Sequence, residues 1–138
     1  MRATAVVIER PEHLVLKELE LTAAAAGDVV VEIAWSGIST GTERLLWSGR
    51  MPSFPGMGYP LVPGYESVGE VVEAGPASGF EVGERVFVPG ARCYADARGL
   101  FGGAASRVVV PGERVRRVDG DLAEEATLLA LAATARHA

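Results

Sequence analysis

Cysteine, histidine and long apolar runs are scarce in this 138-residue chain. The single thiol, Cys93, cannot form an internal disulfide, and no histidine stands near it in sequence to activate it as a nucleophile. No apolar run approaches the ~20 residues of a membrane-spanning helix, and the chain does not open with a signal-peptide pattern. We therefore expect a cytoplasmic protein that is not integral to a membrane.

Clustered positive charge is also lacking. The chain carries 13 basic and 18 acidic residues, for a formal net charge of −5. Nucleic-acid binding needs a basic face that displaces counterions from phosphates, so we expect no nucleic-acid partner. The one tight cluster, Arg114, Arg116 and Arg117, is predicted to be a solvated strand edge, with contact to an anionic substrate tail as the alternative.

A nucleotide-binding loop is missing as well. Gly56-Met57-Gly58 begins a G-x-G pattern, but Leu61 stands where the third glycine belongs, and no strand-to-helix context surrounds it. The chain by itself is therefore not expected to build a dinucleotide-binding fold.

What the chain does contain is a series of short apolar segments separated by glycine or proline. Their spacing, with 17 glycines for tight turns, is typical of an all-β barrel or sandwich. The first three are predicted to be strands of one sheet, with Ala23–Ala26 as a loop. The predicted strands are Arg2–Ile8, Leu14–Leu21, Asp28–Trp35, Ser67–Glu73, Glu84–Pro89, Ser106–Val110 and Val115–Val118.

Two helices are predicted to interrupt the strands. Thr40 and Glu43 have the spacing of a capping box, with Thr40 as the N-cap of a short helix that continues through Trp47. An alanine-rich helix is predicted from about Leu122 to Leu131.

A proline-rich segment follows the first predicted helix. Met51–Pro63 holds four of the eight prolines, so it is predicted to be a stiff irregular loop rather than a strand. Phe54, Met57 and Tyr59 on this loop either support its own packing or form a wall for a flat apolar ligand.

Two runs in the middle of the chain carry a family resemblance. Gly64–Gly75 has the form G-x-E-x-x-G-x-V-x-x-x-G, and Val82–Val86 follows where the family form is G-D-R-V. Together they resemble the signature of the medium-chain dehydrogenase/reductase family. The resemblance implies a mainly β, GroES-like catalytic barrel over residues 1–121. Residues 122–138 are then expected to begin the helical connection to a Rossmann domain that is absent from this chain.

Further residues resemble one branch of that family. Ser36–Glu66 and Leu129–Ala138 are similar to the members that oxidise the 3-(1-hydroxyethyl) group of bacteriochlorophyllide a to 3-acetyl in bacteriochlorophyll synthesis. This resemblance implies an NAD-dependent oxidoreductase with a tetrapyrrole substrate, and it is compatible with a homo-oligomer. It also implies that NAD is bound mainly by the missing domain.

The resemblance fails at the metal ligands. Zinc-type members place cysteine, histidine and cysteine where this sequence has Ser39, Tyr65 and Ala130, and only Glu66 of the G-H-E motif remains. Catalytic zinc needs about three nitrogen, sulfur or carboxylate ligands. The four-cysteine structural lobe of the family is missing too, because Cys93 is alone. We therefore expect neither a catalytic nor a structural zinc.

Without zinc, side chains must handle the proton of the substrate alcohol. The candidates are Tyr65, Ser39, Thr40 and Glu66. In the preferred arrangement Tyr65 bonds the substrate oxygen, Ser39 or Thr40 passes the proton on, and Glu66 orients the group. Simpler roles are also open: Thr40 as a helix cap, Glu66 as the buried partner of an arginine, and Tyr65 as a core aromatic.

Substrate and cofactor contacts follow from the same resemblance. Trp47, with the three loop residues Phe54, Met57 and Tyr59, is predicted to bind the macrocycle, although Trp47 fits a core position equally well. Thr40 and Thr134 are predicted to approach the nicotinamide, with a plain helix-surface position as the alternative for Thr134. Two other functions stay open: a zinc-free reductase of the quinone-oxidoreductase type, and a non-catalytic GroES-like binding module.

Overall fold

Two sheets face each other across a valine-rich core in this computed structural model, which describes residues 1–137. One sheet has the strand order β2-β1-β4-β7 and the other β8-β3-β5-β6-β9. The strands are β1 (Arg2–Arg10), β2 (His13–Glu20), β3 (Asp28–Ser36), β4 (Leu61–Val62), β5 (Ser67–Ala74), β6 (Arg85–Val88), β7 (Arg98–Gly99), β8 (Arg107–Pro111) and β9 (Arg116–Arg117). The helices are α1 (Thr42–Ser48), α2 (Leu129–His137) and the short 3₁₀ turns η1 (Gly112–Arg114) and η2 (Glu124–Leu128).

The larger sheet contains a fully buried run of valines, Val29–Val31 on β3. β3 pairs with β5 on one side and β8 on the other. β-Branched side chains suit a pleated surface, and burial on both faces explains why this run is continuous rather than alternating. This buried run fixes the course of β3 and therefore the position of Ser36 at the end of the strand.

The mainly β architecture with two short α-helices confirms the predicted fold class. The expectation that the first three strands share one sheet is wrong. β1 and β2 pair with each other, whereas β3 belongs to the second sheet. The reason is the predicted loop at Ala23–Ala26, which carries the chain across to the other side of the core, so that β2 and β3 are neighbours in sequence but not in space.

The predicted capping box is also wrong. α1 begins at Thr42, its N-cap is Gly41, and no side chain caps it. Thr40 is instead exposed, ahead of the helix. The last predicted helix is real but displaced, because residues 124–128 form the 3₁₀ turn η2 before α2 starts at Leu129.

The proline-rich loop is irregular except at its end, where Leu61–Val62 forms β4, a strand that the sequence did not indicate. β4 lies between β1 and the equally short β7. Its two residues are completely buried.

The loop folds back onto α1 and holds it in place. Leu46 of α1 is buried in a second apolar cluster with Ile8, Leu61 and Leu100, and the Tyr59 hydroxyl donates a hydrogen bond to the Leu46 carbonyl. Because this cluster ties the helix to both β1 and β4, α1 has a fixed position against the smaller sheet.

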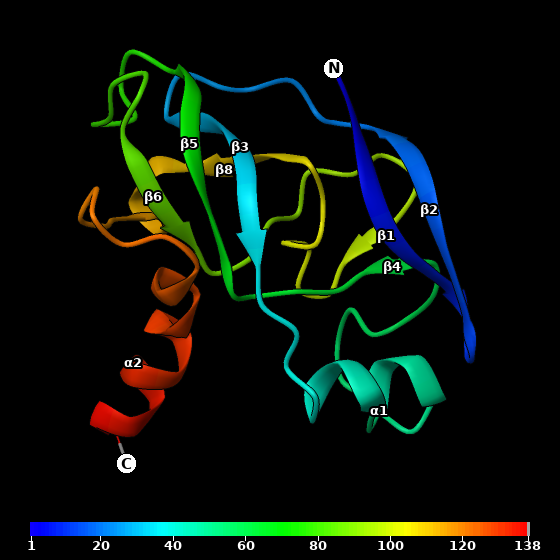
Figure 1. Cartoon of the computed structure of the whole chain (residues 1–138). Coiled ribbons are helices and arrows are strands. Elements are labelled where there is room, and N and C mark those ends of the chain that lie inside the picture. Colours follow the sequence, from blue (N-terminus) through cyan, green and yellow to red (C-terminus); the bar gives the residue numbers. More distant parts are fainter. Residues whose placement is uncertain (138) are drawn as a thin grey trace.

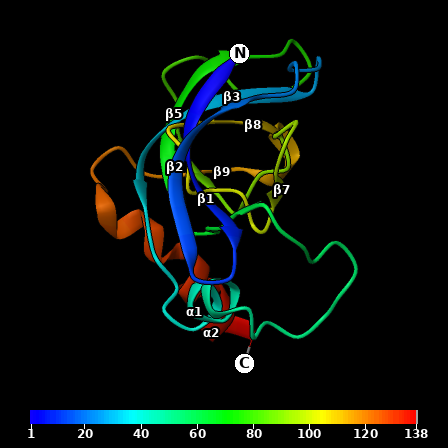
Figure 2. The same ribbon diagram turned by 90° about the vertical axis from the view of Figure 1, so that its right-hand side faces the viewer.

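The two helices lie at the same end of the molecule. Figures 1 and 2 both show α1 and α2 at the end opposite the N-terminus, and Figure 1 shows the segment after β3 running between them. Among residues 1–137, no helix has both the length and the apolar character needed to cross a membrane.

Gly69 in β5 shows why the G-x-E-x-x-G motif requires its last glycine. A Cβ atom there would lie 2.1 Å from the Glu32 carbonyl oxygen on β3, where the β3–β5 register shifts. We expect Gly69→Ala to lower the free energy of unfolding by about 3 kcal/mol, as for overpacking that the backbone must absorb. Urea denaturation of this chain would measure it, with Gly27→Ala as the control because a Cβ at Gly27 meets nothing within 4 Å. Equal stability of the two variants would contradict the explanation.

Candidate active site

The site forms where β3 ends and β5 begins. Ser36 pairs with Ser67 at the end of the β3–β5 ladder, and the backbone N–H of Gly37 donates a 2.8 Å hydrogen bond to the Glu66 carbonyl. The segment that follows Ser36 carries Ser39, and the segment that precedes Ser67 carries Tyr65, near the start of the Gly64–Gly75 motif. The fold therefore places Ser39 and Tyr65, which are 26 residues apart, in contact.

Three hydroxyl groups meet at this point. The Tyr65 hydroxyl donates to Ser39 Oγ at 2.5 Å, and Thr42 Oγ1 lies 3.2 Å from the same phenolic oxygen. Tyr65 is half-buried and packs edge-on against Phe101, with ring centroids 5.5 Å apart and an interplanar angle of 84°. The Tyr65 ring is thus held in one orientation, with its hydroxyl group hydrogen-bonded to the hydroxyl groups of Ser39 and Thr42.

Two carboxyl groups lie beside the hydroxyl cluster. Glu66 is 6% exposed and packs so closely on Gly37 that a Cβ there would be 2.4 Å from Glu66 Oε2. No arginine forms an ion pair with Glu66 in the part of the chain that the structure describes.

Glu43 is the second of these carboxyl groups. Burial raises its pKa above the usual value, and the charge of Glu66 acts in the same direction. The backbone amides of Glu43 and Ser39 have the opposite effect and lower the pKa. Its Oε2 atom is buried without a hydrogen-bond partner within residues 1–137.

An apolar cavity of about 650 Å³ lies on the Glu43 side of the site. Glu43 lines it, whereas Ser39, Thr42, Tyr65 and Glu66 do not. Its volume is in the range of small-molecule binding sites, and its lining is mainly apolar with a few polar groups, which is the usual character of such sites. Thr40, Glu43 and Arg44 supply the polar and charged groups near α1. The apolar wall includes Val6, Ile8, Leu14, Leu16, Ile38 and Trp47.

The four predicted macrocycle contacts separate into two groups. Trp47 lines the cavity and is 42% exposed. Phe54, Met57 and Tyr59 are partly buried against the apolar cluster around Leu46 and do not line it. The proline-rich loop thus uses these side chains to hold α1, which in turn presents Trp47.

The remaining predicted residues lie apart from one another. Thr40 is at the cavity, whereas Thr134 is exposed on α2 and its hydroxyl donates to the Ala130 carbonyl at 3.0 Å. Cys93 is buried, and burial raises the pKa of its thiol, which disfavours the reactive thiolate.

Thr42 and Glu43 are site residues that the sequence motifs do not indicate. Both fall at the predicted helix start with Thr40 as the cap, where their side chains would serve the helix. The signal that could have found them is the polar run Ser39–Glu43 shortly after β3, which carries three hydroxyl side chains and one carboxyl.

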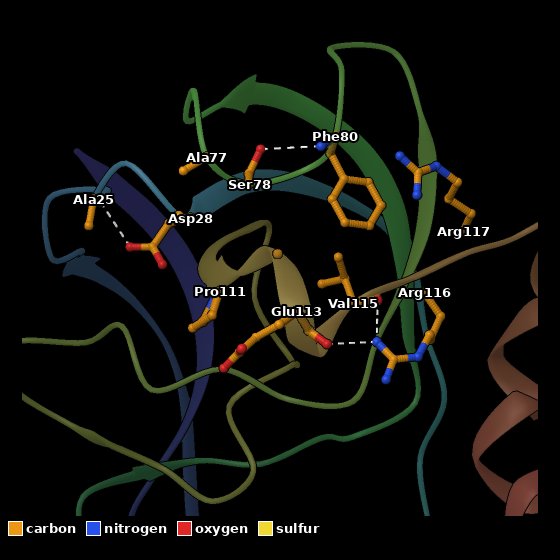
Figure 3. Close-up of a pocket in the computed structure, with 12 residues that line it drawn as sticks. Ala25, Asp28, Ala77, Ser78, Phe80, Pro111, Glu113, Val115, Arg116 and Arg117 are labelled. Carbon is orange, nitrogen blue, oxygen red and sulfur yellow. Dashed lines mark hydrogen bonds between the residues drawn. The ribbon is translucent and has the colours of Figure 1, made fainter.

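A second cavity, of about 630 Å³, lies at the opposite end of the larger sheet and borders the arginine cluster. Arg117 pairs with Glu84 at 2.5 Å and stacks over Phe80, 4.2 Å from the ring centroid. Figure 3 shows Arg116 and Arg117 on one side of this cavity and Asp28 on the other. The mixed charges give the cavity no preference for an anion, and the arginines form the exposed face expected from the sequence.

The donor set at the first site does not suit a catalytic zinc ion. The three ligand positions of zinc-type dehydrogenases hold a hydroxyl, a phenol and, at Ala130, a methyl group, none of which is a preferred zinc ligand. In the described part of the chain, no group of three or more histidine, cysteine, aspartate or glutamate side chains could hold a metal ion.

Comparison with known proteins gives the family directly. The alcohol dehydrogenase GroES-like domain matches residues 25–120. The chain belongs to this family. Gly69 of the Gly64–Gly75 signature and the segments that carry Ser39 and Tyr65 all lie within the residues matched to this domain.

Two curated relatives match over the whole chain. The 2-desacetyl-2-hydroxyethyl bacteriochlorophyllide A dehydrogenase of Cereibacter sphaeroides is 60% identical over 143 residues, and the protein of the same name from Rhodobacter capsulatus is 56% identical over 139 residues. The chain covers 45% and 44% of these relatives, which is less than half of their length.

A solved structure has the same fold. A short chain alcohol dehydrogenase from Escherichia coli CFT073, complexed with the cofactor NADH, superimposes with a TM-score of 0.72 and 26% sequence identity. The match covers 93% of this chain and 42% of that protein.

Proposed function

We propose that this chain is the substrate-binding half of a longer, NAD-dependent dehydrogenase. The dehydrogenase oxidises the 3-(1-hydroxyethyl) group of bacteriochlorophyllide a to 3-acetyl, without a catalytic zinc. The observation that carries the proposal is the 2.5 Å hydrogen bond from Tyr65 to Ser39. These two residues take the sequence positions of a histidine and a cysteine ligand in zinc-type members. The names of the two curated relatives support the substrate, and the NADH complex of the solved relative supports the cofactor.

The hydroxyl cluster replaces the metal in handling the alcohol. Oxidation of a secondary alcohol removes a hydride from carbon and a proton from oxygen. When bound, the nicotinamide supplies the hydride acceptor. The phenolic oxygen of Tyr65 accepts a hydrogen bond from the substrate hydroxyl while its own proton is directed at Ser39, so proton transfer can begin along an existing hydrogen bond. Thr42 fixes the phenol from a second direction.

The apolar cavity is the proposed site of the macrocycle. A tetrapyrrole is flat and mainly apolar, and the cavity offers apolar side chains from β1 and β2 together with the indole of Trp47. Thr40, at the same cavity, is the residue of this chain that we place toward the reacting end of the substrate and the nicotinamide.

The first test is production of NADH by the full-length dehydrogenase given 3-hydroxyethyl bacteriochlorophyllide a. Metal-analysed protein is assayed with and without a strong chelator, and the tetrapyrrole product is identified by mass. We expect an acetyl product and activity that does not change with chelator. Chelator-sensitive turnover would contradict the zinc-free mechanism, and consumption of NADPH with a quinone would instead identify a reductase. Substrate binding without turnover would indicate a binding module.

Replacement of Trp47 tests the cavity separately from catalysis. We expect Trp47→Ala to weaken binding of bacteriochlorophyllide a roughly tenfold, the equivalent of about 1.4 kcal/mol of lost stacking and apolar contact. An absorbance titration of the pigment with this chain measures the effect. Trp35→Ala is the matched control, because Trp35 is similarly exposed at 46% but does not line the cavity. Equal effects of the two substitutions would place the pigment elsewhere.

A further inference from the structure

The hydroxyl cluster lacks a group that can keep the proton. Tyr65, Ser39 and Thr42 can each pass a proton along a hydrogen bond, but a chain of hydroxyls returns to its starting state only if a base stands at its end. Glu66 is one nearby carboxylate, but it is almost fully buried and packed against the Gly37 backbone. The site therefore needs an acceptor with access to the cavity.

Glu43 has the required position. It follows Thr42 on the first turn of α1, where its backbone N–H donates a 2.9 Å hydrogen bond to the carbonyl of Ser39, a member of the hydroxyl cluster. Its side chain lines the apolar cavity proposed for the substrate. Its Oε2 atom is buried and has no hydrogen-bond partner in residues 1–137. A buried carboxylate oxygen without a partner is costly, and such groups in clefts are characteristic of functional sites.

We propose that Glu43 is the terminal proton acceptor of this active site. The inference rests on the proposed function, because it assigns a residue to the same alcohol oxidation. As the substrate O–H bond breaks and the C=O bond forms, the hydride leaves carbon for the nicotinamide. The substrate proton enters the hydroxyl cluster, and one proton leaves the cluster for a carboxylate oxygen of Glu43. The hydroxyls end unchanged, and Glu43 later releases its proton to water.

The charges around Glu43 are suited to this role. Arg44 lines the same cavity, and Glu66 approaches from the segment before β5. Thr42, which precedes Glu43 in the chain, bonds to Tyr65. Burial and the charge of Glu66 raise the pKa of the Glu43 carboxyl, which brings it closer to neutral pH and makes the carboxylate a stronger base. The carboxylate is the active form, so turnover should rise as the pH increases through this pKa and fall below it.

The test compares substitutions of Glu43 in the full-length dehydrogenase. We expect Glu43→Gln to lower kcat by ~10²-fold or more with little change in KM. The substitution should also remove the fall of kcat at low pH, which is the acidic limb of the pH profile. Glu43→Asp should keep part of the activity, and added formate should restore activity to Glu43→Ala, because a small carboxylate can enter the vacated space. Glu70→Gln is the control, since Glu70 is exposed on β5. Circular dichroism verifies that each variant is folded.

The outcomes separate this assignment from the proposed function. If the wild-type dehydrogenase turns over the substrate and Glu43→Gln keeps both its kcat and its acidic limb, the assignment is wrong and the proposed function stands. A second pattern also overturns the assignment: Glu43→Asp loses as much kcat as Glu43→Gln, the acidic limb of the pH profile stays in place, and formate does not restore activity. That pattern indicates a structural role for Glu43. If the wild-type dehydrogenase is inactive with the substrate, the proposed function fails and the assignment fails with it.

A readout independent of turnover uses this chain alone. The Glu43 carboxyl carbon can be titrated by NMR, with Glu43→Gln identifying its resonance. We expect it to titrate above the usual value for glutamate and to shift back toward that value in Glu66→Gln, because the like charge is removed. Titration of Glu43 at or below the usual value would overturn the assignment.

Discussion

Replacing Tyr65 by phenylalanine in the full-length dehydrogenase should lower kcat by ~10²-fold or more, which is the range for a lost proton-transfer group. The substitution removes one oxygen atom and keeps the ring that packs edge-on against Phe101, so the fold should be retained. It breaks the hydrogen bonds to both Ser39 and Thr42 and leaves the substrate hydroxyl without its partner. Single-turnover kinetics with NAD would measure the chemical step directly.

Tyr59→Phe is the matched control for this prediction. It also removes a phenolic oxygen that is hydrogen-bonded, but the lost bond joins the proline-rich loop to the Leu46 carbonyl and lies outside the hydroxyl cluster. We expect it to lower stability and to leave kcat nearly unchanged. If Tyr65→Phe kept the wild-type kcat, the proton would have to leave by another route, and Ser39 and Thr40 would be the next residues to replace.

The fold could be predicted well from the sequence because its strongest signals are local. Valine-rich segments between glycines and prolines identify the longer strands, and the motif at Gly64–Gly75 indicates the barrel. The two-residue strands β4 and β7 gave no such signal, because they are set by pairing with distant residues. The same limit explains the error in sheet assignment, since a loop such as Ala23–Ala26 does not reveal whether it turns back or crosses the core.

The site was predictable only in part, for a related reason. Sequence motifs placed Ser39, Tyr65 and Glu66 near one another, and the structure shows the first two in contact. Whether a given side chain faces the cavity changes when the start of its helix or loop shifts by one or two residues.

Two assignments show this dependence. α1 starts at Thr42, so neither Thr42 nor Glu43 belongs to a cap. Thr42 instead bonds to Tyr65, and Glu43 lines the cavity. The aromatic and methionine side chains of the proline-rich loop fit a ligand wall and a core equally well by composition, and the fold uses them in a core.

The position of α1 therefore depends on its anchor, and the anchor can be tested. We expect Leu46→Ala to lower the free energy of unfolding by about 2–5 kcal/mol, the range for deleting a buried leucine side chain. Leu46 is 1% exposed and is the one buried residue of α1, where it packs with Ile8, Leu61 and Leu100. Urea denaturation of this chain, followed by circular dichroism, measures the change.

Leu45→Ala is the appropriate control, because it makes the same truncation at the neighbouring position, where the side chain is 36% exposed. We expect it to cost less than about 1 kcal/mol. Leu46→Ala should also weaken pigment binding, since a loosened α1 no longer holds Trp47 at the cavity wall, whereas Leu45→Ala should not. Similar unfolding midpoints for the two variants would mean that α1 is held by the hydrogen bond from Tyr59 and by its backbone connections. The apolar cluster would then have no essential part in positioning the hydroxyl cluster, Glu43 and Trp47 relative to one another.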